Sequence, residues 1–399
     1  MKNILMVTPL YPLPTKENKC TYVCHFFTRE WVKMGYNVIV IHTQPVHFWV
    51  WHLFVRFFGK QLNNYFGGGN FYSRKIKSTE HYVMDNVPVF RVPIYNFIPR
   101  GRYPGQSVKK FVNEVYHILS QEHFSPDVIV GHMTSLEIIP EINKIYHVKT
   151  CMVAHGTTAK YKERYSNWDE LIDSYDSWGF RAIPIRHNFE RLFKTVKNPF
   201  YCYSGIPERY ISQKNVHVFN KQLSHFLFIG ELIERKCPIT LLEAIPSVCR
   251  ETYSIKFIGE GNERAHLENY IAANNLSQYV TLVGKVQRDE VTRYLDEAEC
   301  FIMVSRYEAY GLVYLEAMAR GCIVIASRNE GFDGIIKDGE NGFLCDAGNA
   351  QELSSIILYI NSLSNEKRTE ISENALATAR KMTDYLMAKQ YIEHLESIR

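Results

Sequence analysis

The sequence predicts an α/β fold made of two doubly wound domains, each built around a parallel sheet. Three observations lead to this prediction. The 399 residues exceed what one hydrophobic core of ordinary size holds. Short β-branched runs alternate with helical patterns almost throughout, which is typical of parallel α/β units. A polar stretch at 204–222, through which no clear strand pattern continues, separates the alternation into two halves.

The first half contains four predicted strands and two predicted helices. Each strand is a short apolar run, and each helix repeats its apolar residues with the helical period. A predicted hairpin at Tyr82–Pro93, with its turn at 85–88, interrupts the alternation. The predicted strands are Ile4–Val7, Val38–Ile41, Val128–Val130 and Thr150–Val153, and the helices are Tyr22–Met34 and Val108–Leu119.

The second half repeats the same alternation more regularly. Its predicted strands are Phe226–Ile229, Ile255–Ile258, Val280–Val283, Phe301–Val304 and Ile323–Ala326, and its helices lie near Ile239–Cys249, Arg264–Asn274, Asp289–Glu297 and Leu312–Arg320. An amphipathic helix at Thr383–Ile398 is expected to close the chain. Ligands of doubly wound sheets bind at the carboxyl ends of the strands, so two such domains are expected to face each other across a cleft.

Composition and charge narrow the class of protein. A chain that is 46% hydrophobic and 22% charged is not disordered, collagen-like or a disulfide scaffold. The net charge of +4 is uneven, because residues 1–200 carry +10 and the remainder −6. A basic half suits nucleic acid, a membrane or an acidic substrate, but no nucleic-acid-binding motif accompanies the charge. No run reaches the roughly 18 apolar residues of a membrane span, and the apolar start is too short for a signal peptide.

The nine cysteines include no CxxC pair and lie mostly in apolar runs. Buried, reduced thiols are therefore the expected state, and metal ligands or disulfides are the alternatives. Reduced thiols are typical of a cytoplasmic protein, and that is the predicted location.

The segment 305–327 carries most of the chemistry. A predicted strand ends before it, and a helix is expected to begin at Gly311, where unpaired backbone N–H groups suit a phosphate and glycine permits close approach. Glu316 lies about 7.5 Å further along this apolar helix at ~1.5 Å per residue. A buried carboxylate needs a partner. Ribose hydroxyls beside a bound diphosphate would supply one, and a structural arginine is the alternative.

Glu308 and Glu316 form an E-x7-E pair, and the segment around them resembles the donor motif of glycosyltransferase family 4, also called glycosyl transferases group 1. The segments 230–238, 257–268, 279–299 and 334–353 resemble further elements of that family in its order. The resemblance is dense over about 226–353 and weaker over the first 200 residues. It implies a retaining, nucleotide-sugar-dependent enzyme of GT-B architecture. The domains are then 1–207 for the acceptor, 208–378 for the nucleotide sugar, and 379–399 as a helix returning to the first domain.

The resemblance also implies roles for particular residues. Glu316 would hold the ribose, and Glu308 would contact the transferred sugar. The diphosphate would be bound by the backbone of Tyr310, Gly311 and Leu312. Gly230 and the side chains of Arg235 and Lys236, in the loop that begins at Gly230, would complete this site. His155, in VAHGTT at 153–158, would lie near the sugar and acceptor, with a packed core histidine as the alternative. Cys20 and Thr21 stand in the amino-terminal loop that contacts the donor.

Three positions depart from the family pattern. Glu231 stands where the family has an arginine, which makes Arg235 the candidate second cation. Cys20 stands where glycine is usual. Ser204–Gly205 stands where the family often has Asn-Gly. As in the family, the leaving phosphate would accept the acceptor's proton, so no dedicated nucleophile is assigned. No cofactor and no metal are predicted, since the chain has no Asp-x-Asp and no His/Cys cluster with ligand spacing along the sequence.

The predicted function is transfer of a hexose from a UDP- or GDP-sugar to a saccharide or polyprenyl-linked acceptor in surface polysaccharide synthesis. The aromatic and basic segment 46–60 predicts an interfacial helix at the inner face of the plasma membrane, and an ordinary core helix is the alternative. A nucleotide-sugar epimerase on the same fold and a catalytically inactive glycan-assembly scaffold are the alternative functions.

Overall fold

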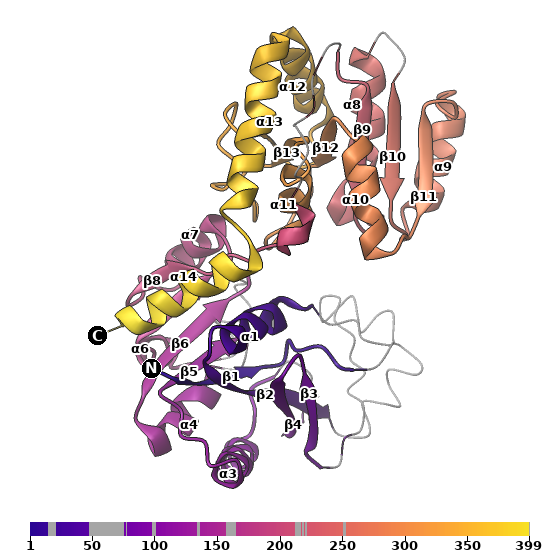
Figure 1. The fold of residues 1–399 in the computed structure, drawn as a ribbon. Helices are drawn as coiled ribbons and strands as arrows, with labels where there is room; N and C mark the ends of the chain where they lie inside the picture. Colours follow the sequence, from indigo (N-terminus) through magenta and orange to yellow (C-terminus); the bar gives the residue numbers. More distant parts are fainter. Residues whose placement is uncertain are drawn as a thin grey trace. The chain divides into compact units, whose positions relative to one another are not determined.

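The computed structural model describes residues 1–14, 21–47, 76, 78–97, 101–133, 136–156, 165–211, 217, 219, 222–249 and 253–398. The chain forms two compact units. Unit 1 comprises Met1–Phe180, His187–Cys202 and Met387–Arg399, and unit 2 comprises Arg181–Arg186 and Tyr203–Leu386. Each unit contains one sheet flanked by helices (Figure 1).

Unit 1 is built on an eight-stranded sheet in the order β3-β4-β2-β1-β5-β6-β7-β8. All neighbours pair in parallel except β3 and β4, which form the antiparallel hairpin predicted from the sequence. β1 and β5 lie at the centre, where their apolar side chains are fully buried. The strands are β1 Asn3–Thr8, β2 Asn37–His47, β3 Glu80–Met84, β4 Val87–Asn96, β5 Val128–His132, β6 Lys149–Ala154, β7 Ser177–Phe180 and β8 Pro199–Tyr201.

The helices of unit 1 are α1 Val23–Lys33, α3 Gly105–Gln121, α4 Ile138–Tyr146 and α6 Trp168–Asp173, with most of α7 Ile183–Leu192 and of α14 Asp384–Ser397. The C-terminal helix α14 packs on α1, because the buried Trp31 donates its indole N–H to the Ala388 carbonyl at 3.0 Å. The Tyr391 ring packs edge-on against Phe27 and Trp31, with ring centroids 5.4 and 5.1 Å apart. The predicted return of the C-terminal helix to the first domain is therefore confirmed.

Unit 2 is built on a six-stranded, wholly parallel sheet in the order β11-β10-β9-β12-β13-β14. Its strands are β9 His225–Ile229, β10 Ser254–Ile258, β11 Val280–Gly284, β12 Cys300–Met303, β13 Ile323–Ser327 and β14 Phe343–Cys345. Its α-helices are α8 Ile239–Val248, α9 Arg264–Ala273, α10 Arg288–Glu297, α11 Leu312–Met318, α12 Ala350–Ser362 and α13 Asn365–Arg380, and the short helices η1 Glu208–Tyr210 and η2 Glu234–Lys236 complete it.

The predicted fold class of two doubly wound parallel sheets is confirmed. The differences are short strands at or near the edges of the sheets and the helices α4, α6, α7, α12 and α13, which the predicted elements do not include. β7, β8 and β14 are absent from the predicted strands, because each has only three or four residues and β7 and β8 contain Gly and Pro. The helix α11 ends at Met318, two residues before the predicted end. Of the predicted interfacial segment 46–60, all but the first two residues lie outside the described part of the chain.

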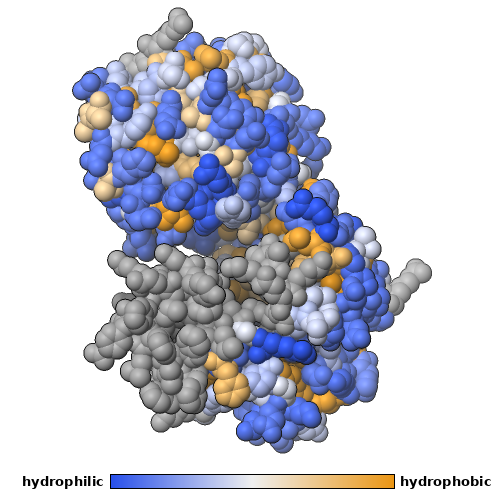
Figure 2. All heavy atoms as spheres, turned by 180° about the vertical axis from the view of Figure 1, so that it is seen from behind, coloured by the Kyte–Doolittle hydropathy of each residue, from blue (hydrophilic) through white to orange (hydrophobic). Residues whose placement is uncertain are grey.

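Hydrophilic side chains cover most of the described surface visible in Figure 2, with apolar ones scattered among them. Among the described residues, none of the helices has the length and apolar character needed to cross a membrane. The eight cysteines in the described part of the chain are free thiols, and all except Cys249 are buried.

Candidate functional site

The strand order of unit 2 places a topological switch point between β9 and β12. From β9 the chain continues to β10 and β11 on one side, whereas β12, β13 and β14 extend the sheet on the other side. Ligands of doubly wound sheets bind at such a point, beyond the carboxyl ends of the two central strands. The loops that begin there are 230–236 after β9 and 304–311 after β12. They contain six of the predicted site residues.

The two loops meet through an ion pair between Lys236 and Glu308. The side chains of Lys236 and Glu308 are only 12% and 11% exposed. The backbones are joined as well, because the Arg306 N–H donates to the Arg235 carbonyl at 2.7 Å. The structure therefore brings together the cation predicted for the diphosphate and the carboxylate predicted for the sugar, although they are 72 residues apart in the sequence.

Arg235 lies next to this pair on the exposed side of η2. Its guanidinium approaches the Tyr307 carbonyl at 3.5 Å, so it lies above the loop that follows β12. Glu231, which replaces the arginine usual in the resembled family, is also exposed. Two cations, Lys236 and Arg235, thus lie at the switch point, one half-buried and one in water.

The loop after β12 is held by a residue that the sequence did not reveal. Glu330, which follows β13, accepts the backbone N–H groups of Tyr307 and Glu308 at 2.8 and 2.7 Å. Tyr307 has φ +56°, a conformation that bulky residues rarely adopt, and its side chain is 83% exposed. Burial raises the pKa of Glu330, and the two N–H groups partly offset this effect. Glu330 therefore fixes the backbone that presents Glu308.

Gly311 supports the predicted close approach at the start of α11. Its φ of +79° is available to glycine at little cost, and a Cβ there would lie 2.3 Å from the Tyr314 ring. The Tyr310 side chain is engaged within unit 2, because its hydroxyl donates to the Ser204 carbonyl at 2.6 Å and Arg181 lies over its ring. Tyr310 and Leu312 would therefore contact the diphosphate of a donor through their backbone.

Gly230, which ends β9, allows the neighbouring loop to pack tightly. A Cβ on Gly259 would lie 1.9 Å from the Gly230 carbonyl oxygen, and Gly259 has φ +139°. The Gly230 N–H donates to the Ile258 carbonyl at 2.9 Å. The glycines at the ends of β9 and β10 therefore let two backbones lie in contact beside the switch point.

Glu316 has an arginine partner. Its side chain is 12% exposed, and its carboxylate accepts a hydrogen bond at 2.9 Å from Arg288, the first residue of α10, whose side chain is 47% exposed. Burial raises the pKa of Glu316, and Arg288 partly offsets that effect. The structural partner considered as the alternative for Glu316 is thus present. Arg288 was not among the predicted site residues, since it lies 28 positions before Glu316.

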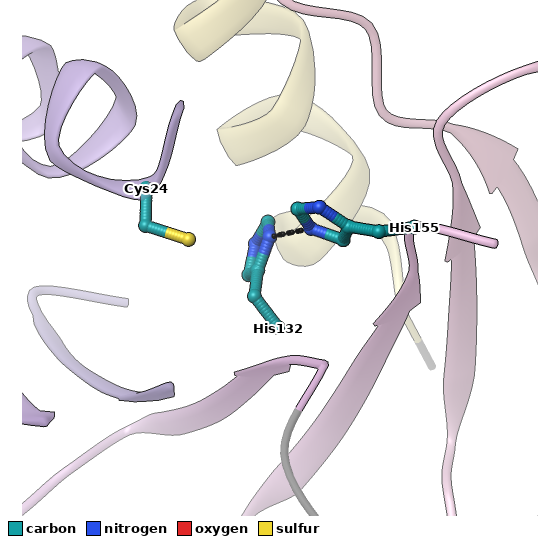
Figure 3. Close-up of side chains that lie close together, drawn as sticks. All are labelled: Cys24, His132 and His155. Carbon is teal, nitrogen blue, oxygen red and sulfur yellow. Dashed lines mark hydrogen bonds between the residues drawn. The ribbon is translucent and has the colours of Figure 1, made fainter. Parts of the chain in front are cut away.

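The predicted site residues of the first half lie in unit 1. Thr21 is exposed in the turn before α1, and Cys20 lies outside the described residues. His155 follows β6 and is half-buried, with its Nε2 atom 3.0 Å from Nδ1 of the fully buried His132 (Figure 3). His132 ends β5, next to β1 at the switch point of this sheet. Nothing in the sequence marked His132 beyond its position just after a predicted strand.

Comparison with known proteins identifies the family of this chain. The model of the family "Glycosyl transferases group 1" matches residues 211–378. An uncharacterised glycosyltransferase from Methanocaldococcus jannaschii is 30% identical over 271 residues, which span 66% of this chain and 71% of the relative. The amylovoran biosynthesis glycosyltransferase AmsK from Erwinia amylovora is 32% identical over 282 residues, 65% of this chain and 67% of the relative.

A solved structure has the same fold. HepE from Anabaena, in complex with UDP, superposes with a TM-score of 0.68 at 16% identity and covers all of both chains. Together with the relatives above, this likeness confirms the predicted family and architecture. The chain belongs to the glycosyl transferases group 1 family, the retaining glycosyltransferases of family 4 that use nucleotide sugars, and it has the GT-B fold.

Proposed function

We propose that this enzyme transfers a hexose from a UDP- or GDP-linked sugar to a saccharide or lipid-linked saccharide during the synthesis of a surface polysaccharide. One observation carries the proposal: the ion pair of Lys236 and Glu308 at the switch point of unit 2. A cation and a carboxylate held side by side match the two parts of a nucleotide sugar, since the diphosphate is anionic and the sugar offers hydroxyl donors.

Lys236 and Arg235 are proposed to stabilise the leaving nucleoside diphosphate. The ammonium group of Lys236 has three donors, so it can keep Glu308 and still donate to a phosphate oxygen. Negative charge grows on the diphosphate as the bond to the sugar carbon breaks. Cations that are already in place stabilise this charge without reorganisation, which is the largest contribution in many enzymes.

The proposed reaction needs no covalent intermediate with the protein. The bond between the sugar carbon and the diphosphate oxygen breaks, and the acceptor oxygen forms its bond on the same face. The acceptor's proton passes to the departing phosphate. Glu308, with its remaining acceptor positions, would orient the hydroxyls of the transferred sugar. His155 is proposed to lie near the acceptor and the sugar.

Glu316 is proposed to hold the ribose. Its carboxylate is buried and has an arginine partner, Arg288, that is half exposed. Ribose hydroxyls are neutral donors, so they would donate to the Glu316 carboxylate beside Arg288 or in its place. Arg288 would then be free to turn toward water or toward the nucleotide.

The relatives support the finer parts of the proposal. AmsK is named for amylovoran biosynthesis, and the solved HepE complex contains UDP. These names favour a polysaccharide product and a uridine nucleotide for this chain too. The lipid-linked acceptor remains the part that depends on the segment 46–60, most of which lies outside the described residues.

A thermal-unfolding panel with UDP, GDP, ADP, CMP and dTDP, each with and without magnesium, tests the donor site. A ligand present at ~100 times its dissociation constant adds about 2.7 kcal/mol, which moves the midpoint by several degrees. We expect one nucleoside diphosphate to stand apart and its effect to weaken strongly in Glu316→Ala. Equal shifts across the panel, or none, would contradict a nucleotide-sugar site.

The identified nucleotide sugar is then incubated with saccharide and polyprenyl-diphosphate acceptors, and the anomeric configuration of the product is read by NMR. Transfer with retention to either acceptor supports the proposal. Conversion of the nucleotide sugar without any acceptor would instead indicate an epimerase. Nucleotide binding with neither reaction would indicate an inactive assembly protein.

A further inference from the structure

Three side chains with metal-binding atoms meet at the switch point of the sheet in unit 1. Cys24 lies in the first turn of α1, His132 ends β5, and His155 follows β6. Among the residues that the structure describes, these three form the one His/Cys/Asp/Glu group close enough to hold a metal ion. β5 and β6 are parallel neighbours, so both histidines emerge at the same edge of the sheet.

The distances within the cluster suit a small cation. One ligand atom of each residue lies within 4.8 Å of those of the other two, and Nδ1 of His132 is 3.0 Å from Nε2 of His155. Ligand atoms around a tetrahedral zinc ion lie roughly 3.3–3.6 Å apart, given bonds of about 2.0 Å to nitrogen and 2.3 Å to sulfur. Figure 3 shows the two imidazoles directed at each other and the Cys24 sulfur pointing toward them.

The surroundings of His132 resemble those of a metal ligand. Its second ring nitrogen, Nε2, lies 3.2 Å from the hydroxyl of Tyr391 on α14. Metal-binding histidines almost always bond through the other ring nitrogen to a polar partner, which fixes the tautomer. A tyrosine hydroxyl has lone pairs that can accept this N–H.

We propose that Cys24, His132 and His155 bind one divalent transition-metal ion of the zinc class and leave a fourth position for water or a ligand. A thiolate and two neutral imidazoles favour zinc and similar ions, whereas magnesium and calcium require oxygen ligands. Binding releases the thiol proton of Cys24 to solvent. Cys24 and His132 are fully buried, so the ion would enter beside the half-buried His155.

Direct binding tests the proposal with the full chain, purified without a histidine tag and freed of metal by a chelator. Zn²⁺ is titrated against a chromophoric chelator, and Co²⁺ is added to a second sample. We expect one equivalent of Zn²⁺ with a dissociation constant below micromolar. We also expect a thiolate-to-cobalt charge-transfer band in the near ultraviolet, which reports a Cys ligand without any substitution.

Matched variants assign the ligands. Cys24→Ser and His132→Gln are expected to weaken Zn²⁺ binding at least about 100-fold, and Cys24→Ser to abolish the charge-transfer band. Tyr391→Phe keeps the ring contacts and removes only the hydroxyl, so a loss of about 10-fold is expected. Cys249→Ser, a thiol of unit 2, is the control and should bind like the wild type.

Circular dichroism checks that each variant is folded. The absence of Zn²⁺ binding, or a wild-type cobalt band in Cys24→Ser, would overturn the proposal and leave His132 and His155 as a hydrogen-bonded pair without metal. Because the readout is binding and not sugar transfer, this result is independent of whether the proposed transferase activity is found.

Discussion

Replacing Glu316 by glutamine should weaken donor binding while leaving the ligand-free protein as stable or more stable. The Glu316 side chain is 12% exposed, and its carboxylate has one ion-pair partner, the half-exposed Arg288. Burial raises the pKa of this carboxyl above its ordinary value of 4.5, so the charged form of Glu316 lowers the stability of the folded state. Glutamine has almost the same shape and keeps one oxygen acceptor, but it carries no charge.

The loss of donor affinity follows from the hydrogen bonds. A hydrogen bond to a charged group contributes about 1.5–3 kcal/mol. If ribose hydroxyls donate to Glu316, neutral glutamine should lose most of that contribution. At about 1.4 kcal/mol for each tenfold change, the dissociation constant of the nucleoside diphosphate should rise about 10- to 150-fold.

The stability change has the opposite sign, and its pH dependence can be stated. The folded-state pKa of Glu316 is raised, so between its unfolded value near 4.5 and its folded value the native state binds more protons than the unfolded state. Stability therefore falls as the pH rises through this window, and the full cost is present above the folded pKa. Glu316→Gln removes this dependence. Its free energy of unfolding should match the wild type below about pH 4.5 and equal or exceed it at pH 8.

Calorimetric titration with the nucleoside diphosphate and urea unfolding at pH 4 and pH 8 measure both effects. Glu268→Gln is the control, because Glu268 also pairs with an arginine, Arg264 at 2.9 Å, but is 54% exposed. The control should change neither affinity nor the pH dependence. Unchanged nucleotide affinity in Glu316→Gln would refute the ribose contact. A large loss of stability at pH 8 would refute the assignment of burial as the dominant effect.

Three further outcomes follow from the contacts described above. Lys236→Ala should leave the Glu308 carboxylate without its ion-pair partner and destabilise the protein by about 3 kcal/mol in urea unfolding. It should also lower kcat at least about 100-fold. A folded, fully active variant would contradict the proposed charge stabilisation. Glu330→Ala should weaken nucleotide affinity by releasing two backbone N–H groups, with Glu330→Gln intermediate in the same titration. If His155 acts in transfer as proposed, Zn²⁺ should inhibit it, a chelator should restore it, and Cys24→Ser should resist inhibition in the same assay.

The sequence predicted the fold of the second half well because its signals are local. Glu308 and Glu316 stand eight residues apart, in a strand-loop-helix unit whose buried strand is evident from the sequence alone. Gly311 stands at the start of α11 with φ +79°, a conformation that glycine adopts at little cost. Lys236 needed the family resemblance as well, since nothing in its own neighbourhood indicates that β9 lies beside β12.

The residues that the sequence missed act across large separations. Glu330 holds the Glu308 loop from the end of the next strand, and Arg288 reaches Glu316 from the start of another helix. The cluster of Cys24, His132 and His155 depends on a strand order in which β1, β5 and β6 are neighbours. The prediction of no metal site used ligand spacing along the chain, and such spacing does not detect ligands brought together by sheet topology.

The net charge of the second half is a poor guide to the proposed diphosphate site. The second half of the chain carries −6, which by itself argues against binding an anionic diphosphate there. Screening limits exposed charges to a range of about 10 Å at ordinary ionic strength, so only the groups at the switch point matter for a ligand bound at that point. There Glu308 is paired with Lys236 and Arg235 is an exposed cation, whereas Glu231 and Glu234 in the same loop are exposed carboxylates. Some acidic residues of this half, such as Glu297 and Glu370, form exposed ion pairs on the helices α10 and α13. The proposed attraction for a diphosphate would therefore depend on the placement of Lys236 and Arg235 in the loop after β9, and not on the charge summed over the domain.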